Sequence, residues 1–115
     1  MQAIANARYI KGSARKMRQV MNLVRGKNVE DALNILRFTH KKNAMILEKV
    51  IRSAVANAQN IYGDKIHDPN ELSIVDAQCG EGPIMKRIKA RAMGRAYRIR
   101  KRTCHVKVVV GTEEE

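Results

Sequence analysis

Residues 84–102, IMKRIKARAMGRAYRIRKR, decide between two folds for this chain. The stretch carries nine Lys or Arg residues and no acid. Its apolar residues recur every three or four positions, and its Arg, Lys, Ala and Met are good helix formers, which favours an arginine-rich helix. The same stretch also fits a β-hairpin that turns near Met93 and Gly94 and continues the strands expected on either side. Periodicity leaves both structures open.

The hairpin interpretation predicts how the cations are distributed over the two faces of the ribbon. In any register that pairs odd with even positions, one face collects Arg87, Lys89, Arg91, Arg98, Arg100 and Arg102, and the other holds Lys86, Arg95 and Lys101. Like charges then face each other across the strands, so we expect the ribbon to need an anionic partner. The alternative is a solvated, disordered charge run. The interleaved Ile, Met and Tyr residues and the flanking strands argue against it.

The positive charge of the chain is concentrated in this arm, defined here as about residues 83–102. The net charge is +12, of which the arm supplies +9, so the other positions contribute only +3. Such a local excess indicates a footprint for a polyanion. The 115 residues suffice for one domain, 1–115, whose core must be aliphatic because the chain has one Phe, three Tyr and no Trp.

Three segments outside the arm have the apolar spacing of helices. The first begins at Ser13 as N-cap and stops at Gly26, the second begins at the cap Asn28, and the third covers 41–62 before Gly63. The stripes predicted to be buried are Ala14, Met17, Val20, Met21 and Val24; Val29, Ala32, Leu33 and Leu36; and Ala44, Leu47, Val50, Ile51, Ala54, Val55, Ala58 and Ile61.

Strands are expected at 2–10, 71–79 and 103–110. In the second of these the parity of the apolar residues shifts near Val75, which predicts a bulge. The third alternates Cys104, Val106, Val108 and Val110 with Thr103, His105, Lys107 and Val109. Residues 63–70 have the composition of a loop, and Glu113, Glu114 and Glu115 are expected to form a solvated tail.

The sequence offers no catalytic constellation, metal site or cofactor motif. Its three His residues are far apart, and no Gly-rich phosphate loop is present. Cys79, Cys104 and His105 lack the paired spacing of structural zinc ligands. Two cysteines make no disulfide framework, so a reducing compartment is expected. We expect neither a membrane span nor a secretory signal.

Four blocks resemble, in the same order, a family of universal ribosomal proteins. They are SARKMRQVMNLVRGK (13–27), VEDALNILRFTHKKNA (29–44), IRSAVANAQN (51–60) and GEGPIMKRIKARAMGRAYRIRKRTCHV (80–106). Lys86, RAMGR at 91–95 and HVKVVV at 105–110 resemble the C-terminal signature of the large-subunit protein L-twenty-two family, at bacterial length. The resemblance covers nearly the whole chain.

This resemblance implies an α+β fold with three helices packed on a small antiparallel sheet and a long protruding β-hairpin. The globular body is then 1–82 and 103–112. In the family, the body lies near the exit of the peptide tunnel and the hairpin threads through ribosomal RNA. Members act in subunit assembly, and hairpin changes can alter the response to macrolides. The implied location is the cytoplasm, within the large subunit. The implied partners are large-subunit rRNA, neighbouring ribosomal proteins and the nascent peptide, with no membrane and no obligate homo-oligomer.

The resemblance also assigns site residues. The RNA-binding residues of the arm are Lys86, Arg87, Lys89, Arg91, Arg95, Arg98, Arg100, Lys101 and Arg102. The tip that lines the tunnel is Arg91, Ala92, Met93, Gly94 and Arg95. In the body, Lys16, Arg18, Arg25 and Lys27 are expected to bind RNA, the alternative being solvated charges opposite a buried stripe.

The chain departs from the family at four positions. Relatives often have Pro where it has Ala14, His40 and Ala90, and usually Ser where it has Cys104. Pro at position 90 would forbid a helix through the arm and Ala does not, so the free arm is expected to sample helix more than its relatives do. The RNA-bound arm is still expected to be the hairpin.

A second function remains open on these residues, that of a DNA-binding or other nucleic-acid regulator, for instance one acting in antitermination. No helix shows the exposed base-reading set that a recognition helix needs, which counts against it. An enzyme is a distant third, because no acid–base or nucleophile constellation is present.

Overall fold

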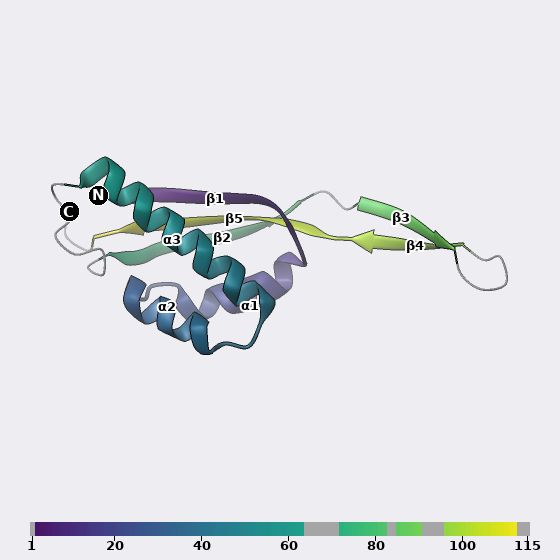
Figure 1. Ribbon diagram of the computed structural model, residues 1–115, viewed down its shortest axis with the longest axis horizontal. Coiled ribbons are helices and arrows are strands. Elements are labelled where there is room, and N and C mark those ends of the chain that lie inside the picture. Colours follow the sequence, from purple (N-terminus) through teal and green to yellow (C-terminus); the bar gives the residue numbers. More distant parts are fainter. Residues whose placement is uncertain (1, 64–71, 83–84, 91–95, 113–115) are drawn as a thin grey trace.

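The computed structural model describes residues 2–63, 72–82, 85–90 and 96–112. The elements are β1 (Gln2–Lys11), α1 (Ala14–Val24), α2 (Val29–Phe38), α3 (Lys42–Tyr62), β2 (Ser73–Glu81), β3 (Met85–Ala90), β4 (Ala96–Lys101) and β5 (Thr103–Gly111). They confirm the predicted α+β class (Figure 1). The predicted loop beyond Gly63, the turn residues 91–95 and the tail 113–115 lie outside the described residues.

A three-stranded antiparallel sheet forms the centre of the body. Its strand order is β1-β5-β2, and α3 packs on β1 and β5 while α1 packs on β2 (Figure 1). Because side chains alternate along a strand, β5 turns its buried Cys104, Val106, Val108 and Val110 to the helices. The register of β2 shifts between Ile74 and Asp76, which confirms the predicted bulge.

The helices form where the apolar stripes predict them. All five stripe residues of α1 are buried. At the start of α2, Asn28 Oδ1 accepts a hydrogen bond of 2.9 Å from Glu30 N, which confirms the predicted cap. Ser13 occupies the N-cap position of α1 with extended backbone, but its hydroxyl makes no capping bond. Among the described residues, the hydrophobic core consists of aliphatic residues, Met and Cys, in agreement with the aliphatic core expected from the composition.

The predicted stripe of α3 is wrong at its last member. Ile61 is 63% exposed, whereas Ala58, one turn earlier, is buried. The helix passes β1 near the beginning of that strand, where Asn57 Nδ2 donates to Ile4 O at 2.9 Å. The final turn therefore continues beyond the strand, and among the described residues it has no sheet beneath it. Leu33 and Val55, also predicted to be buried, are only partly buried against the core.

The arm is a β-hairpin wherever the structure describes it. β3 and β4 form a separate two-stranded antiparallel sheet that projects from the body (Figure 1). The molecule consequently measures 64 Å along its longest axis against 26 and 16 Å along the others. Ala90 ends β3 and pairs with Ala96, so the helical alternative does not hold over 85–90 and 96–101.

Candidate nucleic-acid interface

The register of the arm differs from the expected one. Arg87 lies opposite Ile99, Lys89 opposite Tyr97, and Ala90 opposite Ala96, so odd positions face odd ones. The prediction that one face gathers six cations is therefore wrong. The physical reason is the connection: five residues, 91–95, separate Ala90 from Ala96, and a connection of odd length pairs positions of the same parity.

This register divides the charge evenly over the ribbon. Directly opposite residues share a face of an antiparallel pair. One face of the described ladder therefore holds positions 87, 89 and 101, and the other holds positions 86, 98 and 100, three cations each. Within this ladder Lys86 opposite Arg100 is the one like-charged pair, because the other four cations lie opposite Met85, Ile88, Tyr97 and Ile99. This register therefore places fewer like-charged positions directly opposite each other than the expected one did.

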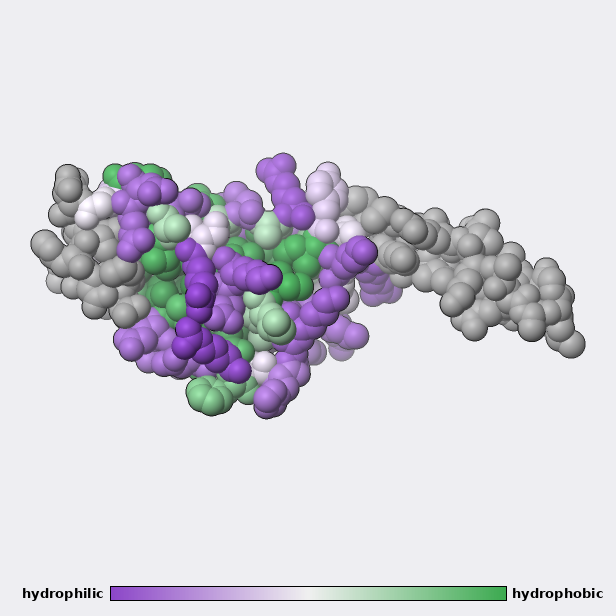
Figure 2. Space-filling model, in the orientation of Figure 1, coloured by the Kyte–Doolittle hydropathy of each residue, from purple (hydrophilic) through white to green (hydrophobic). Residues whose placement is uncertain are grey.

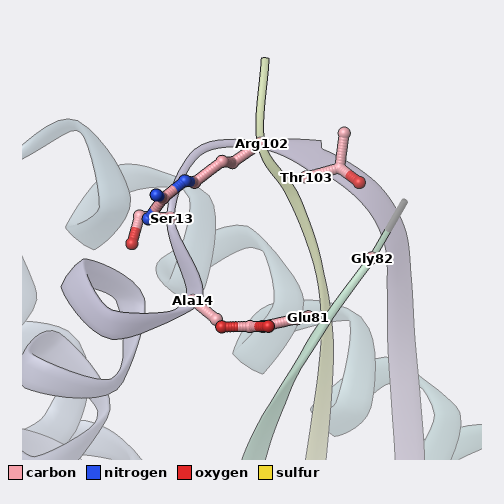
Figure 3. A pocket seen from close by; sticks show the side chains of 6 residues that line it. All are labelled: Ser13, Ala14, Glu81, Gly82, Arg102 and Thr103. Atoms are coloured by element: carbon pink, nitrogen blue, oxygen red, sulfur yellow. The ribbon is translucent and has the colours of Figure 1, made fainter. Parts of the chain in front are cut away.

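The root of the arm is fastened to the body by backbone hydrogen bonds. Gly12 N donates to Arg102 O, and Gly82 N donates to Thr103 O, both at 2.9 Å. A Cβ at Gly82 would lie 2.5 Å from Thr103 Oγ1, so any side chain there would force Thr103 to shift. Beside these bonds lies a small recess of about 170 Å³, across which Arg102 extends toward Ser13 (Figure 3). The last cation of the arm is thus held beside the start of α1.

Two of the four predicted body cations have a structural partner. Arg18 Nε and Nη2 donate to Cys79 O at 3.0 and 2.8 Å, and Arg25 Nη2 donates to Ala77 O at 2.6 Å. β2 is an edge strand, and the two arginines, two helical turns apart, reach alternate carbonyls of it. Neither the RNA interpretation nor the solvated alternative predicted this contact, which fastens α1 to the sheet.

Lys16, in contrast, lies in a basic groove. The groove, of about 610 Å³, is open and is lined by Lys11, Gly12, Ser13, Lys16, Gln19, Lys41, Lys42 and Asn43. A neighbouring hollow adds Arg15 and Arg102. None of the residues lining either cavity is acidic. The sequence did not single out Lys11, Lys41 or Lys42, because three separate segments bring them together.

Two helix ends add to the potential of this basic groove. Ser13 is the N-cap of α1 and Lys41 that of α3; neither side chain caps its helix, and neither first turn contains an acid. The positive ends of both helix dipoles therefore border four lysines, an arrangement that favours phosphate. Lys27 is exposed but lies elsewhere, in the α1–α2 connection, where its carbonyl accepts from Ile74 N at 2.9 Å.

The surface of the body is mostly hydrophilic on the face seen in Figure 2, including the region from which the arm departs. Some of its cations are already paired. Glu48 accepts from Arg52 at 2.8 Å and lies 3.6 Å from Arg37. These two arginines have less positive charge to offer an external anion than the lysines of the basic groove.

Cys79 and Cys104 are neighbours on the helix-facing side of the sheet. Cys79 pairs with Val106 and Cys104 pairs with Glu81. The two cysteines are therefore diagonal neighbours on adjacent strands, offset by two residues from direct pairing. Both are buried free cysteines. Burial, followed by the neighbouring Cys104, raises the pKa of Cys79 to about 12, although the Arg18 guanidinium acts in the opposite direction. Cys79 is therefore a neutral, unreactive thiol at pH 7.

We expect both cysteines to be free thiols in protein denatured directly from fresh lysate, and to react far more slowly in the native state. A thiol reagent should titrate two groups per chain after denaturation; titrating none would reveal a disulfide. The pKa of Cys79 rises from 9.0 to about 12 on folding. Its contribution to stability is therefore complete below about pH 9 and is lost as the pH rises toward 12, which denaturant midpoints would report.

Neither a metal cluster nor a membrane-spanning helix occurs in the described part of the chain. Within these residues, no three His, Cys, Asp or Glu side chains gather in a way that could hold a metal ion. None of the described helices combines the length and apolar character needed to cross a bilayer.

The comparisons with known proteins agree with the architecture. The family described as Ribosomal protein L22p/L17e matches residues 5–111. "Large ribosomal subunit protein uL22" of Thermoanaerobacter sp. (strain X514) is 50% identical over 114 residues, covering 99% of this chain and 100% of that protein. The protein of the same name from Maridesulfovibrio salexigens is 54% identical over 110 residues, covering 96% of this chain and 97% of its own. With a hairpin arm, a three-helix body and this similarity along its length, the chain belongs to the Ribosomal protein L22p/L17e family.

Proposed function

We propose that this chain is a structural constituent of the large ribosomal subunit that binds large-subunit rRNA through its arm and basic groove. The observation that carries the proposal is the even distribution of cations over both faces of a ribbon that projects from the body. Such a ribbon suits a position surrounded by phosphates better than one on a flat surface. The relatives named above are large-subunit proteins, which supports the same partner.

The finer parts of the proposal concern the arrangement in the subunit. The chain acts as one domain, with the body at 1–82 and 103–112 outside and the arm at about 83–102 inside the RNA. Residues 91–95 contribute to the wall of the peptide tunnel and meet the nascent peptide. The body contacts neighbouring ribosomal proteins and supports assembly in the cytoplasm. The proposed function requires no catalytic residue, metal or cofactor.

The four body cations should separate into two pairs. Replacing Lys16 and Lys27 by Ala should weaken rRNA binding and lower its salt slope by about 0.7 to 0.9 for each phosphate that is no longer neutralised, without changing stability. Replacing Arg18 and Arg25 by Ala should instead lower the free energy of unfolding by about 1 kcal/mol for each residue, because carbonyls of β2 lose their donors. Filter binding over a salt series and urea unfolding measure the two effects.

Lys49→Ala is a matched control, since this exposed lysine of α3 does not line the basic groove. It removes the same charge and should change the salt slope less than Lys16→Ala does. Wild-type binding by the Lys16/Lys27 variant would show that these cations are solvated charges. An unchanged unfolding midpoint in the Arg18/Arg25 variant would count against their structural role.

Co-sedimentation tests the function as a whole. The chain should remain with large subunits during washing in high salt and should not be recovered with DNA. Release from subunits together with association with DNA would favour the alternative, a DNA-binding or other nucleic-acid regulator. A protein that lacks the arm would separate the contribution of the arm from that of the body.

A further inference from the structure

A strained tyrosine lies on the sheet face opposite to the helices, close to the root of the arm. The pairing of β1 with β5 shifts register between Ala7 and Ile10, so Arg8 and Tyr9 together oppose His105. Tyr9 has φ = 57°, a left-handed conformation that bulky residues rarely adopt. Bulges with such a residue commonly use Gly. A strained aromatic at this position suggests that its side chain serves a purpose other than stability.

Two contacts hold Tyr9 in place. Its backbone N–H donates to His105 Nδ1 at 3.1 Å, and the two rings meet edge to face with centroids 4.9 Å apart. The bond requires an unprotonated Nδ1 on His105. Tyr9 is nevertheless 66% exposed as a residue, so it is accessible to a ligand. The bulge thus presents an oriented, solvent-facing aromatic ring instead of burying one.

On the other side of His105 the sheet leaves room. Gly80 of β2 pairs directly with His105, and a Cβ built at Gly80 meets no atom within 4 Å. Tyr9, His105 and Gly80 therefore cross all three strands as a shallow surface, which we call the neck platform. One lysine flanks it on the same sheet face: Lys107, paired with Asn6. It lies two residues from His105 along β5, about 7 Å away.

We propose that the neck platform binds an unpaired RNA base, which stacks on Tyr9 while Lys107 contacts an adjoining phosphate. The inference rests on the proposed rRNA binding and specifies one of its sites. Stacking on an exposed aromatic beside positive charge is how proteins hold single-stranded nucleic acid without reading its sequence. The open space above Gly80 allows a planar group to lie over the sheet next to His105. A duplex would not fit this role, since its bases are stacked inside.

If the neck platform binds a base, substitutions that remove it should lower the affinity for RNA without lowering the stability of the protein. Tyr9→Asn removes the ring and installs a residue that tolerates positive φ. Gly80→Val fills the open space with a residue that favours strands. Both variants should unfold at the same or a higher temperature than wild type. Both should bind deproteinised bacterial large-subunit rRNA at least about fivefold more weakly, the lower bound of one base stacked on an aromatic. Tyr9→Phe keeps the ring and should bind like wild type.

A spectroscopic variant makes the test local. The chain has no Trp, so Tyr9→Trp introduces a single indole at the neck platform. Its fluorescence should be quenched and shielded from acrylamide by the same rRNA and by poly(A), and less so by a poly(A)·poly(U) duplex. Loss of affinity without a change in salt slope supports stacking, because Tyr9 carries no charge.

Three results would overturn the proposal. The first is wild-type affinity of both Tyr9→Asn and Gly80→Val while wild type binds rRNA. The second is an indole equally accessible with and without RNA. The third is equal shielding by the duplex, which would show that the neck platform senses phosphates alone. If the wild-type protein itself does not bind the rRNA, the proposed function fails, and this inference fails with it. If the wild type binds and the variants bind equally well, only this inference fails.

Discussion

Deleting residues 86–100 should make rRNA binding much weaker and far less dependent on salt, while leaving the body folded. The deletion removes seven Lys or Arg residues. If each neutralises a phosphate, the slope of log affinity against log salt falls by about 5 to 6. The described core lies wholly in β1, the three helices, β2 with the adjoining Leu72, and β5, so its packing does not depend on the deleted segment.

The register of the arm specifies how to close the gap. Met85 and Lys101 are direct cross-strand partners, so an Asn-Gly turn can join them as a two-residue hairpin. A second variant should retain the arm and replace the seven cations of residues 86–100 by Gln, which keeps the length of the arm and removes the same charge as the deletion. Equal loss of salt dependence in both variants assigns the effect to charge. An unchanged salt slope in the deletion protein would show that the arm is a solvated charge run.

Ile51→Ala should destabilise the body strongly, with a loss of about 2 to 5 kcal/mol in the free energy of unfolding. Ile51 is fully buried in α3, the helix that packs on β1 and β5. The substitution removes apolar packing and leaves a cavity that the surrounding elements fill only in part. Proteins of this size are stable by about 5 to 15 kcal/mol, so urea unfolding should show a large shift of the midpoint.

Ile61→Ala is the matched control, because it makes the same chemical change in the same helix at an exposed position. It should change stability by no more than about 0.5 kcal/mol. Alanine also has the higher helix propensity, which offsets part of the reduced packing. Equal destabilisation by Ile51→Ala and Ile61→Ala would mean that the last turn of α3 is covered after all. The pair thus tests the position at which helical periodicity predicted burial and the structure shows exposure.

The secondary structure of the arm and the distribution of its charge could not be predicted from the sequence alone. The spacing of apolar residues fitted both a helix and a hairpin. Such spacing reports the secondary structure only where one face is buried against a protein core, and the arm has no such core. Its flanking strands and the family resemblance favoured the hairpin, and the structure agrees for 85–90 and 96–101. The predicted distribution of charge was wrong, since it depended on whether the connection has an odd or even number of residues. Only the pairing of Ala90 with Ala96 settled that parity.

The cations of the body show a second limit. Sequence placed Lys16, Arg18, Arg25 and Lys27 together as RNA contacts, but hydrogen bonding to β2 sets two of them apart. Whether an arginine faces solvent or a sheet edge depends on where a strand some fifty residues or more away passes the helix. The bulge at Tyr9 escaped notice for a similar reason, because β1 has too few buried side chains for its alternation to show a break.

By itself the sequence determined the class of the protein, the three helices, the Asn28 cap of α2, the bulge in β2 and the local excess of positive charge. Each of these depends on the order of residues within one segment, which periodicity, capping chemistry and charge report directly. The tertiary structure alone decided which distant residues meet. It placed Lys11, Lys16, Lys41 and Lys42 around one groove, and Tyr9, Gly80 and His105 across three strands. Those contacts follow from strand register and helix packing, which fix relations between segments that no single segment encodes.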